Sequence, residues 1–199
     1  MKELLNYDDE NHEYFILADR AIHIPSVSEI LNPIMSDFEL PEKYRIRGKM
    51  VHEATELYDD GKYLPELVPD KVVPYMIAYD NFHQEHDVEY EASEMMVFNK
   101  QYFYAGRLDR IWKVDGELFL TDIKTGGKYR WHPLQLAGYQ LACEGCKLGL
   151  KLSSLYLQEF EYKWHEWGDV TEAVSLFLAL VKIYWFQHPA DYKRLRKLC

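Results

Sequence analysis

Two aspartates and a lysine fall inside short apolar runs of the chain, where buried strands normally carry no charge. Asp109 lies in the run GRLDRIW, and Asp122 lies in LFLTDIK together with Lys124. Asp122 and Lys124 are two residues apart, so on a strand both side chains leave the same face of the sheet. Two neighbouring carboxylates repel each other, and burial raises the pKa of at least one of them. A divalent cation removes that penalty, and hard oxygen ligands favour Mg²⁺ or Mn²⁺.

A lysine beside such a metal site is suited to the hydrolysis of phosphodiesters. A bound metal lowers the pKa of its water and neutralises phosphate oxygens. The ammonium of Lys124 can position that water and stabilise the charge that develops during attack on phosphorus. The alternative is a structural ion pair between Asp122 and Lys124, followed by the turn TGG. The presence of Asp109 one strand earlier favours the hydrolytic interpretation.

Three predicted strands would position these side chains. Residues 90–99, 102–114 and 117–125 are rich in aromatic and branched residues, and the dipeptide DG between the last two is a strong hairpin signal. They predict an antiparallel meander. Counting back from the hairpin turn places Asp109 near the level of Asp122. The two carboxylates are therefore expected to meet at one point of the sheet.

The rest of the chain predicts helices around this meander. Residues 13–31 indicate one or two strands, a turn at Pro25 and a short helix capped by Ser26 or Ser28. The other expected elements are helices at 48–61, 73–86, 132–145 and 169–186, and strands at 152–160 and 161–167. We expect an α/β fold with a central mixed sheet flanked by helices. It would form a single domain over 1–199, with an arm at about 1–40 and a catalytic core at about 44–186.

Composition argues for a folded globule and against a strongly basic nucleic-acid binder. The 199 residues are 48% hydrophobic, and their formal net charge is −10. Basic residues nevertheless gather at 42–49, 124–130 and 192–198, so a local positive patch is expected on an acidic protein. The sixteen tyrosines and five tryptophans could supply stacking surfaces for bases, although most aromatics in a globular chain form its core.

Cysteine usage and hydropathy indicate a cytoplasmic protein. The three cysteines, Cys143, Cys146 and Cys199, are an odd and low number that fits a reducing compartment. The first residues lack the apolar stretch of a signal peptide. The most apolar segment, 173–186, is shorter than the roughly 20 residues that a membrane helix needs, so no membrane partner is expected.

The motifs GRLDRI, DIKTG and QLAGY follow one another as in a known family. They resemble the signature of RecB-like nucleases in the PD-(D/E)xK superfamily, and the match runs from His52 to Tyr139. IPSVSEIL and RIRGKMVHEATELYDDG resemble the beginning of phage-type members. The resemblance implies a restriction-endonuclease-like core. Some relatives carry an iron–sulfur cluster held by four cysteines, and three cysteines cannot supply that set, so no cluster is expected.

The resemblance also assigns roles to individual residues. Asp109 and Asp122 would hold Mg²⁺ or Mn²⁺, with the Ile123 carbonyl and His52 as further ligands. Lys124 would be the catalytic lysine.

Other roles implied by the resemblance lie around this centre. Glu94 matches a catalytic-site carboxylate of many members, and Glu91 is the competing candidate. Gln135 and Tyr139 would support the site or contact the DNA strand. Thr125 would orient the lysine or contact DNA. The remaining expected DNA contacts are Arg47, Lys49, Lys128 and Arg130.

The implied function is a metal-dependent deoxyribonuclease. Phage-type relatives act in recombination, replication or repair, and exonuclease activity on linear DNA is preferred over endonuclease activity. DNA, duplex or single-stranded, would be the substrate, with a homo-oligomer and a single-strand-annealing or recombination protein as further partners; a viral protein would act in the host cytoplasm. The alternatives are an inactive DNA-binding or assembly module on the same fold and, more distantly, a protein-binding accessory subunit. Strand polarity, strand preference and oligomeric state stay open.

Overall fold

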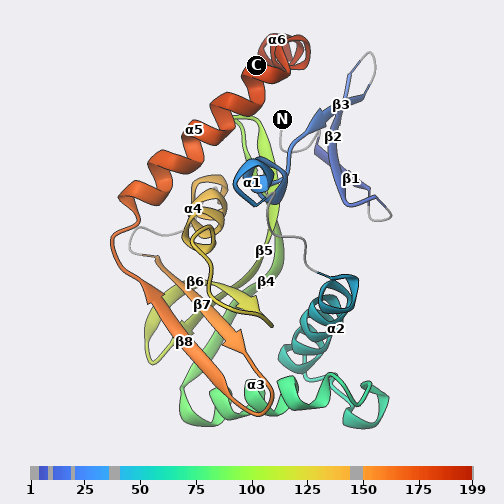
Figure 1. Ribbon diagram of the computed structural model, residues 1–199, viewed down its shortest axis with the longest axis vertical. Coiled ribbons are helices and arrows are strands. Elements are labelled where there is room, and N and C mark those ends of the chain that lie inside the picture. Colours follow the sequence, from blue (N-terminus) through green and yellow to red (C-terminus); the bar gives the residue numbers. More distant parts are fainter. Residues whose placement is uncertain (1–4, 9–10, 19–20, 36–40, 144–149, 199) are drawn as a thin grey trace.

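The computed structural model describes residues 5–8, 11–18, 21–35, 41–143 and 150–198. A five-stranded sheet in the order β4-β5-β6-β7-β8 forms its centre, with helices on both faces (Figure 1). The strands are β4 (Val88–Asn99), β5 (Tyr104–Val114), β6 (Glu117–Lys124), β7 (Lys151–Leu157) and β8 (Tyr162–Trp167). Only β6 and β7 pair in parallel among these neighbours. The expected α/β fold with a mixed central sheet is confirmed.

The hairpin between β5 and β6 sets the level of the site. Asp115 and Gly116 have φ angles of 52° and 82°, the left-handed conformation that a two-residue hairpin turn requires. From this turn the antiparallel ladder runs to the pair Arg110–Thr121 and ends there. Asp109 and Asp122 are the next residues along the two strands, so they lie at the same level, as the count from the turn predicted.

Helices form a layer on each face of the sheet. They are α1 (Val27–Met35), α2 (Glu42–Asp59), α3 (Val73–Glu85), α4 (His132–Ala142), α5 (Thr171–Gln187) and α6 (Pro189–Leu198), with a short 3₁₀ helix at Pro65–Leu67. Val51 of α2 and Phe82 of α3 pack with Trp112 of β5 in one core cluster. Leu136 of α4 and Phe177 of α5 belong to a second cluster. α4 follows β6 and leads back to β7, which permits the parallel pair.

A small antiparallel sheet precedes the central one. It consists of β1 (Leu5–Asp8), β2 (Glu13–Leu17) and β3 (Ala21–Ile24). After β3, Ser26 caps α1: its Oγ accepts a hydrogen bond from the Glu29 N–H at 3.0 Å, and Glu29 Oε2 accepts one from the Ser26 N–H at 3.3 Å. Ser26, not Ser28, is therefore the cap.

Several boundaries differ from the sequence-based prediction. α2 begins at Glu42, so the basic run 42–49 forms its first turns instead of a loop before it. α5 buries only one stripe of side chains, and Phe186 on it is 85% exposed. β1 and α6 were not predicted. α4 ends at Ala142, and residues 144–145 of the helix expected at 132–145 lie outside the described residues.

Two further findings concern the cysteines and membranes. Cys143 takes part in a disulfide, which differs from the reduced state expected from the cysteine count. Cys146 and Cys199 lie outside the described residues. Among the helices of the described segments, none combines the length and apolar character needed to cross a bilayer.

Candidate active site

Three potential metal ligands converge from three elements. His52 of α2, Glu94 of β4 and Asp109 of β5 each offer one ligand atom, and these atoms all lie within 4.8 Å of one another. His52 Nδ1 is 3.6 Å from Asp109 Oδ2. Two carboxylates and one imidazole form a donor set that suits a hard divalent cation, in particular Mn²⁺, which accepts both oxygen and nitrogen ligands.

The end of the β5–β6 ladder holds Asp109 in place. Beyond the last backbone pair, Asp109 Oδ2 accepts a hydrogen bond from the Ile123 N–H at 2.7 Å. The carboxylate thus pairs with the Ile123 N–H of β6, for which the backbone of β5 provides no hydrogen-bond acceptor. Only 8% of Asp109 is exposed, so this bond also fixes the orientation of a nearly buried charge.

Glu94 lies opposite Asp109 on the neighbouring strand. The β4–β5 register pairs Ser93 with Arg110 and Met95 with Leu108, which leaves Glu94 facing Asp109 between the two pairs. Its φ angle is 45°, a left-handed conformation that is uncommon for a residue other than glycine. Backbone strain of this kind is concentrated at functional sites. Glu91, the competing candidate, is exposed and lies outside the cluster.

Burial and neighbouring charges raise the pKa of two carboxyl groups in this region. Burial, and then the charge of Asp109, raises the pKa of the Glu94 carboxyl to about 7. Burial also raises the pKa of Asp122 to about 6; the Asp109 charge adds to this rise, and the Lys124 ammonium opposes it. A bound dication would favour the ionised form of each group.

Arg110 links the carboxylates to α2, a role that the sequence analysis missed. Its guanidinium is fully buried and donates to Glu94 Oε1 at 3.2 Å and to the Asp109 carbonyl at 2.8 Å. It also donates to Asp59 Oδ2 at 2.5 Å and to Thr55 Oγ1 at 3.2 Å. The signal in the sequence was a second charge, next to Asp109, inside an apolar strand.

Lys124 is held by two residues that the sequence analysis assigned to the site. Its Nζ lies 2.9 and 2.7 Å from the two oxygens of Asp122 and donates to Gln135 Oε1 at 3.1 Å. Gln135 Nε2 in turn donates to Tyr139 Oη at 3.1 Å. Tyr139 packs so closely on Gly106 that a Cβ there would lie 2.6 Å from its ring. Gln135 and Tyr139 therefore support the lysine from α4.

Asp122 lies beside the lysine and not within the cluster of potential metal ligands. Among the described residues, the group within 4.8 Å contains His52, Glu94 and Asp109 but not Asp122. Asp122 is only 2% exposed, and its charge is balanced by Lys124. The sequence analysis placed Asp122 on the metal and Glu94 among the catalytic-site carboxylates; the metal role of Asp122 stays a prediction.

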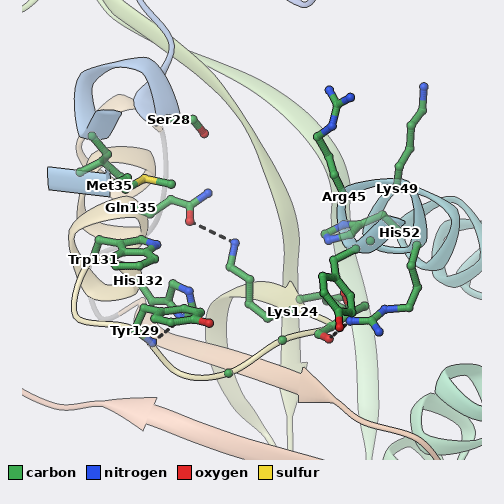
Figure 2. Close-up of a pocket in the computed structure, with 18 residues that line it drawn as sticks. Ser28, Met35, Arg45, Lys49, His52, Lys124, Tyr129, Trp131, His132 and Gln135 are labelled. Atoms are coloured by element: carbon green, nitrogen blue, oxygen red, sulfur yellow. Dashed lines mark hydrogen bonds between the residues drawn. The ribbon is translucent and has the colours of Figure 1, made fainter. Parts of the chain in front are cut away.

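A cleft of about 360 Å³ opens over Lys124. Arg45, Lys49 and His52 of α2 lie on one side of it, and the amino-terminal end of α4 lies on the other (Figure 2). Arg47 also lines the cleft, and its Nη2 donates to the Thr125 carbonyl at 2.7 Å. Arg45 was not singled out before, although it belongs to the predicted basic run 42–49.

The other two expected phosphate contacts lie elsewhere. Lys128 Nζ donates to His165 Nε2 at 2.8 Å and lies 4.6 Å from the centre of the Trp167 ring, beside a separate hollow. Arg130 is exposed and does not line the cleft. Arg47, Lys49 and Thr125 thus lie at the cleft, whereas Lys128 and Arg130 lie outside it.

Comparison with known proteins assigns the family. A sequence model of the PD-(D/E)XK nuclease superfamily matches residues 48–174 of the 199-residue chain. The matched region contains the cluster of potential metal ligands, the lysine and its supporting helix. The chain therefore belongs to the PD-(D/E)XK nuclease superfamily and carries a nuclease domain of that class.

Other comparisons are less informative. No curated protein matched the chain. A solved structure titled "Crystal structure of SSO0001" is 16% identical, with 79% of this chain and 84% of that chain covered, at a TM-score of 0.30. This likeness is too weak to support an argument about structure or function.

Proposed function

We propose that this chain is a metal-dependent deoxyribonuclease that hydrolyses phosphodiester bonds, with linear DNA as its substrate and exonuclease activity as its mode. The observation that carries the proposal is the convergence of His52, Glu94 and Asp109, with His52 and Lys124 both lining a cleft that has further basic side chains. Membership of a nuclease superfamily supports it. The exonuclease mode and a role in recombination, replication or repair rest on the resemblance to RecB-like and phage-type members.

The cation would be held by His52, Glu94 and Asp109. Asp122 and the Ile123 carbonyl are the further ligands expected from the resemblance. A dication bound there supplies a more acidic water and neutralises phosphate oxygens. Burial, and then the charge of Asp109, raises the pKa of Glu94, and a dication would offset both effects, so these residues fit such an ion.

Lys124 would act on the nucleophile and on the scissile phosphate. Asp122 and Gln135 accept two of the hydrogen bonds that its ammonium can donate, which fixes the direction in which the group points. A third N–H is left to donate toward an oxygen of the phosphate or of the attacking water. A fixed positive charge at that point stabilises the negative charge that accumulates on the phosphoryl oxygens.

The basic side of the cleft would bind the DNA backbone. Arg45, Arg47 and Lys49 lie along the first turns of α2 and line the cleft. Figure 2 shows Arg45 and Lys49 on the opposite side from α4. This local charge is how a chain with a net charge of −10 could approach a polyanion. Because the contacts are electrostatic, binding should weaken steeply as the salt concentration rises.

The direct test is digestion of linear and covalently closed circular DNA in Mg²⁺ and in Mn²⁺, with a chelator control. Digestion of the linear form alone supports the proposal. Digestion of both forms would replace the exonuclease mode by an endonuclease mode. If neither metal supports cleavage of either form, the chain is not the enzyme proposed here.

A matched pair of lysine variants separates an enzyme from an inactive DNA-binding module. Lys124→Ala should abolish cleavage and retain DNA binding. The lysine stabilises the charge that develops during hydrolysis, whereas the basic side chains of α2 bind the DNA backbone. Lys182→Ala, an exposed lysine on α5, should leave both unchanged. An inactive binding module would show no catalytic difference between the two variants.

A further inference from the structure

Two aromatic rings form part of the cleft and have no role in the proposed hydrolysis. Tyr129 and Trp131 both line the cleft, and their rings are stacked with centroids 4.5 Å apart and an angle of 3° between planes. Both are half-buried. They lie on the α4 side of the cleft, with Lys124 between them and the α2 side (Figure 2).

A buried histidine packs against both rings of this aromatic pair. The His132 ring meets both Tyr129 and Trp131 edge to face, at centroid distances of 5.5 and 6.0 Å. His132 is 3% exposed, and its Nδ1 lies 2.8 Å from Tyr156 Oη. Burial, and then the charges of nearby lysines, lowers its pKa to about 3, so the imidazole is neutral and brings no charge of its own to the wall. The stacked pair is therefore held in a fixed orientation.

Two glycines lie in the loop between the lysine and the rings. Gly126 and Gly127 follow Thr125, and both line the cleft. A Cβ added at Gly126 would meet nothing within 4 Å, and one at Gly127 would come only within 3.7 Å of Tyr129 Oη. The glycines therefore leave room for a ligand to contact Lys124 and the aromatic pair at the same time.

We propose that Tyr129 and Trp131 form a stacking wall for an unpaired nucleobase of the strand whose phosphate is bound at Lys124. The inference rests on the proposed function in taking DNA as the ligand, and it adds the substrate class. A flat aromatic face attracts any base by stacking, independently of sequence. Inside a duplex, both faces of a base are covered by its neighbours, so a base reaches such a wall only after leaving the stack.

The size and the two sides of the cleft fit one nucleotide. A volume of about 360 Å³ is near the lower end of the range for pockets that enclose a small molecule. Basic side chains on α2 would face the phosphate, while the rings at the start of α4 would face the base. The preferred substrate is therefore a single strand, or a duplex whose terminal nucleotide is unpaired.

The test is binding of a short single-stranded oligonucleotide and of its blunt duplex to the intact protein. Fluorescence anisotropy would be measured at low salt with Ca²⁺ as the cation, after checking that the DNA stays uncut. Trp131→Ala and Tyr129→Ala should each weaken single-strand binding by about tenfold, the loss of one stacked base. Binding of the blunt duplex should not change, and Trp131→Phe should restore single-strand binding.

Two controls make the result specific. Phe186→Ala removes a highly exposed apolar side chain, on α5 and outside the cleft, and should have no effect. An abasic site moved along the strand should weaken binding to the parent protein at one position. At that position, the abasic site should not weaken the binding of DNA to the Trp131→Ala variant any further.

The outcomes also separate this inference from the proposed function. If Trp131→Ala and Tyr129→Ala bind the single strand as tightly as the parent protein, the proposal of a stacking wall is wrong, whatever the nuclease assay shows. An equal loss on duplex and single strand would also overturn it, because the rings would then not read an unpaired base. If the parent cuts no DNA but the ring variants lose single-strand binding, the nuclease proposal fails and the stacking wall stands.

Discussion

Replacing Glu94 by glutamine tests whether the site stores electrostatic strain that a cation relieves. Glutamine keeps the shape of the side chain and an oxygen that can accept from Arg110, but it removes the charge that faces Asp109. The change should therefore stabilise the metal-free protein at alkaline pH. It should also remove most of the stabilisation that Mg²⁺ gives to the parent protein, because one anionic ligand is lost.

The magnitude follows from the raised pKa of Glu94. A rise from 4.5 to about 7 corresponds to about 3 kcal/mol, since each tenfold change in acid dissociation is worth ~1.4 kcal/mol. The side chain keeps 21% of its exposure, so screening reduces the expected gain to about 2 kcal/mol. For a chain of 199 residues this is a rise of about 4–8 °C in Tm.

The sign of the pH dependence is set by the direction of the shift. The unfolded carboxyl ionises near 4.5, and the folded one ionises only near 7. The folded state then binds more protons than the unfolded state between these values, so the parent protein loses stability as the pH rises through this window. The advantage of Glu94→Gln should be near zero below pH 4.5, grow across the window and be constant above pH 7.

Thermal unfolding followed by circular dichroism, in a chelator and across this pH range, measures the effect. Glu91→Gln is the matched control, because it removes an exposed carboxylate from the same strand and should change the curve little. If Glu94→Gln is no more stable than the parent at pH 8, or if its advantage is the same at every pH, the account of a strained carboxylate pair is wrong.

Three further substitutions test the supports of the site. Gly106→Ala places a Cβ against the Tyr139 ring, so we expect a loss of about 1–3 kcal/mol in urea unfolding; an unchanged midpoint would contradict this close contact. Arg110→Met leaves Asp59 buried without its cationic partner, and a loss of about 3–5 kcal/mol is expected in the same assay. Gln135→Leu removes one acceptor of the site lysine and should lower kcat more than it raises KM; a pure KM effect would indicate a role in binding DNA.

Much of the fold could be predicted because its signals are local. The Asp-Gly turn fixes the β5–β6 hairpin, and the alternation of apolar residues on the strands follows from the pleat. The start of α2 was missed because charged residues at 42–49 give no apolar periodicity, although helix formation does not require it there. α5 contains the most apolar segment of the sequence, 173–186, but only one of its faces packs against the core.

The site was predictable only to the level of the strands that carry it. Register counting placed Asp109 beside Asp122, because both positions are counted from the same turn, one on the strand before it and one on the strand after it. The approach of Glu94 depends on a left-handed residue within β4, which no pattern of residue types announces. The partners of Arg110 come from α2 and β4, elements distant in sequence, so only the tertiary structure brings them together.

The end of the β5–β6 ladder at the pair Arg110–Thr121 has a consequence for which substitutions this fold can accept. Beyond this pair, one oxygen of Asp109 accepts a hydrogen bond from the Ile123 N–H and so takes the place of a backbone carbonyl. An apolar residue at position 109 would leave this buried amide without its acceptor, at a cost of about 1–3 kcal/mol. The carboxylate therefore belongs to the scaffold as well as to the cluster of potential metal ligands, so a single replacement there would weaken both at once.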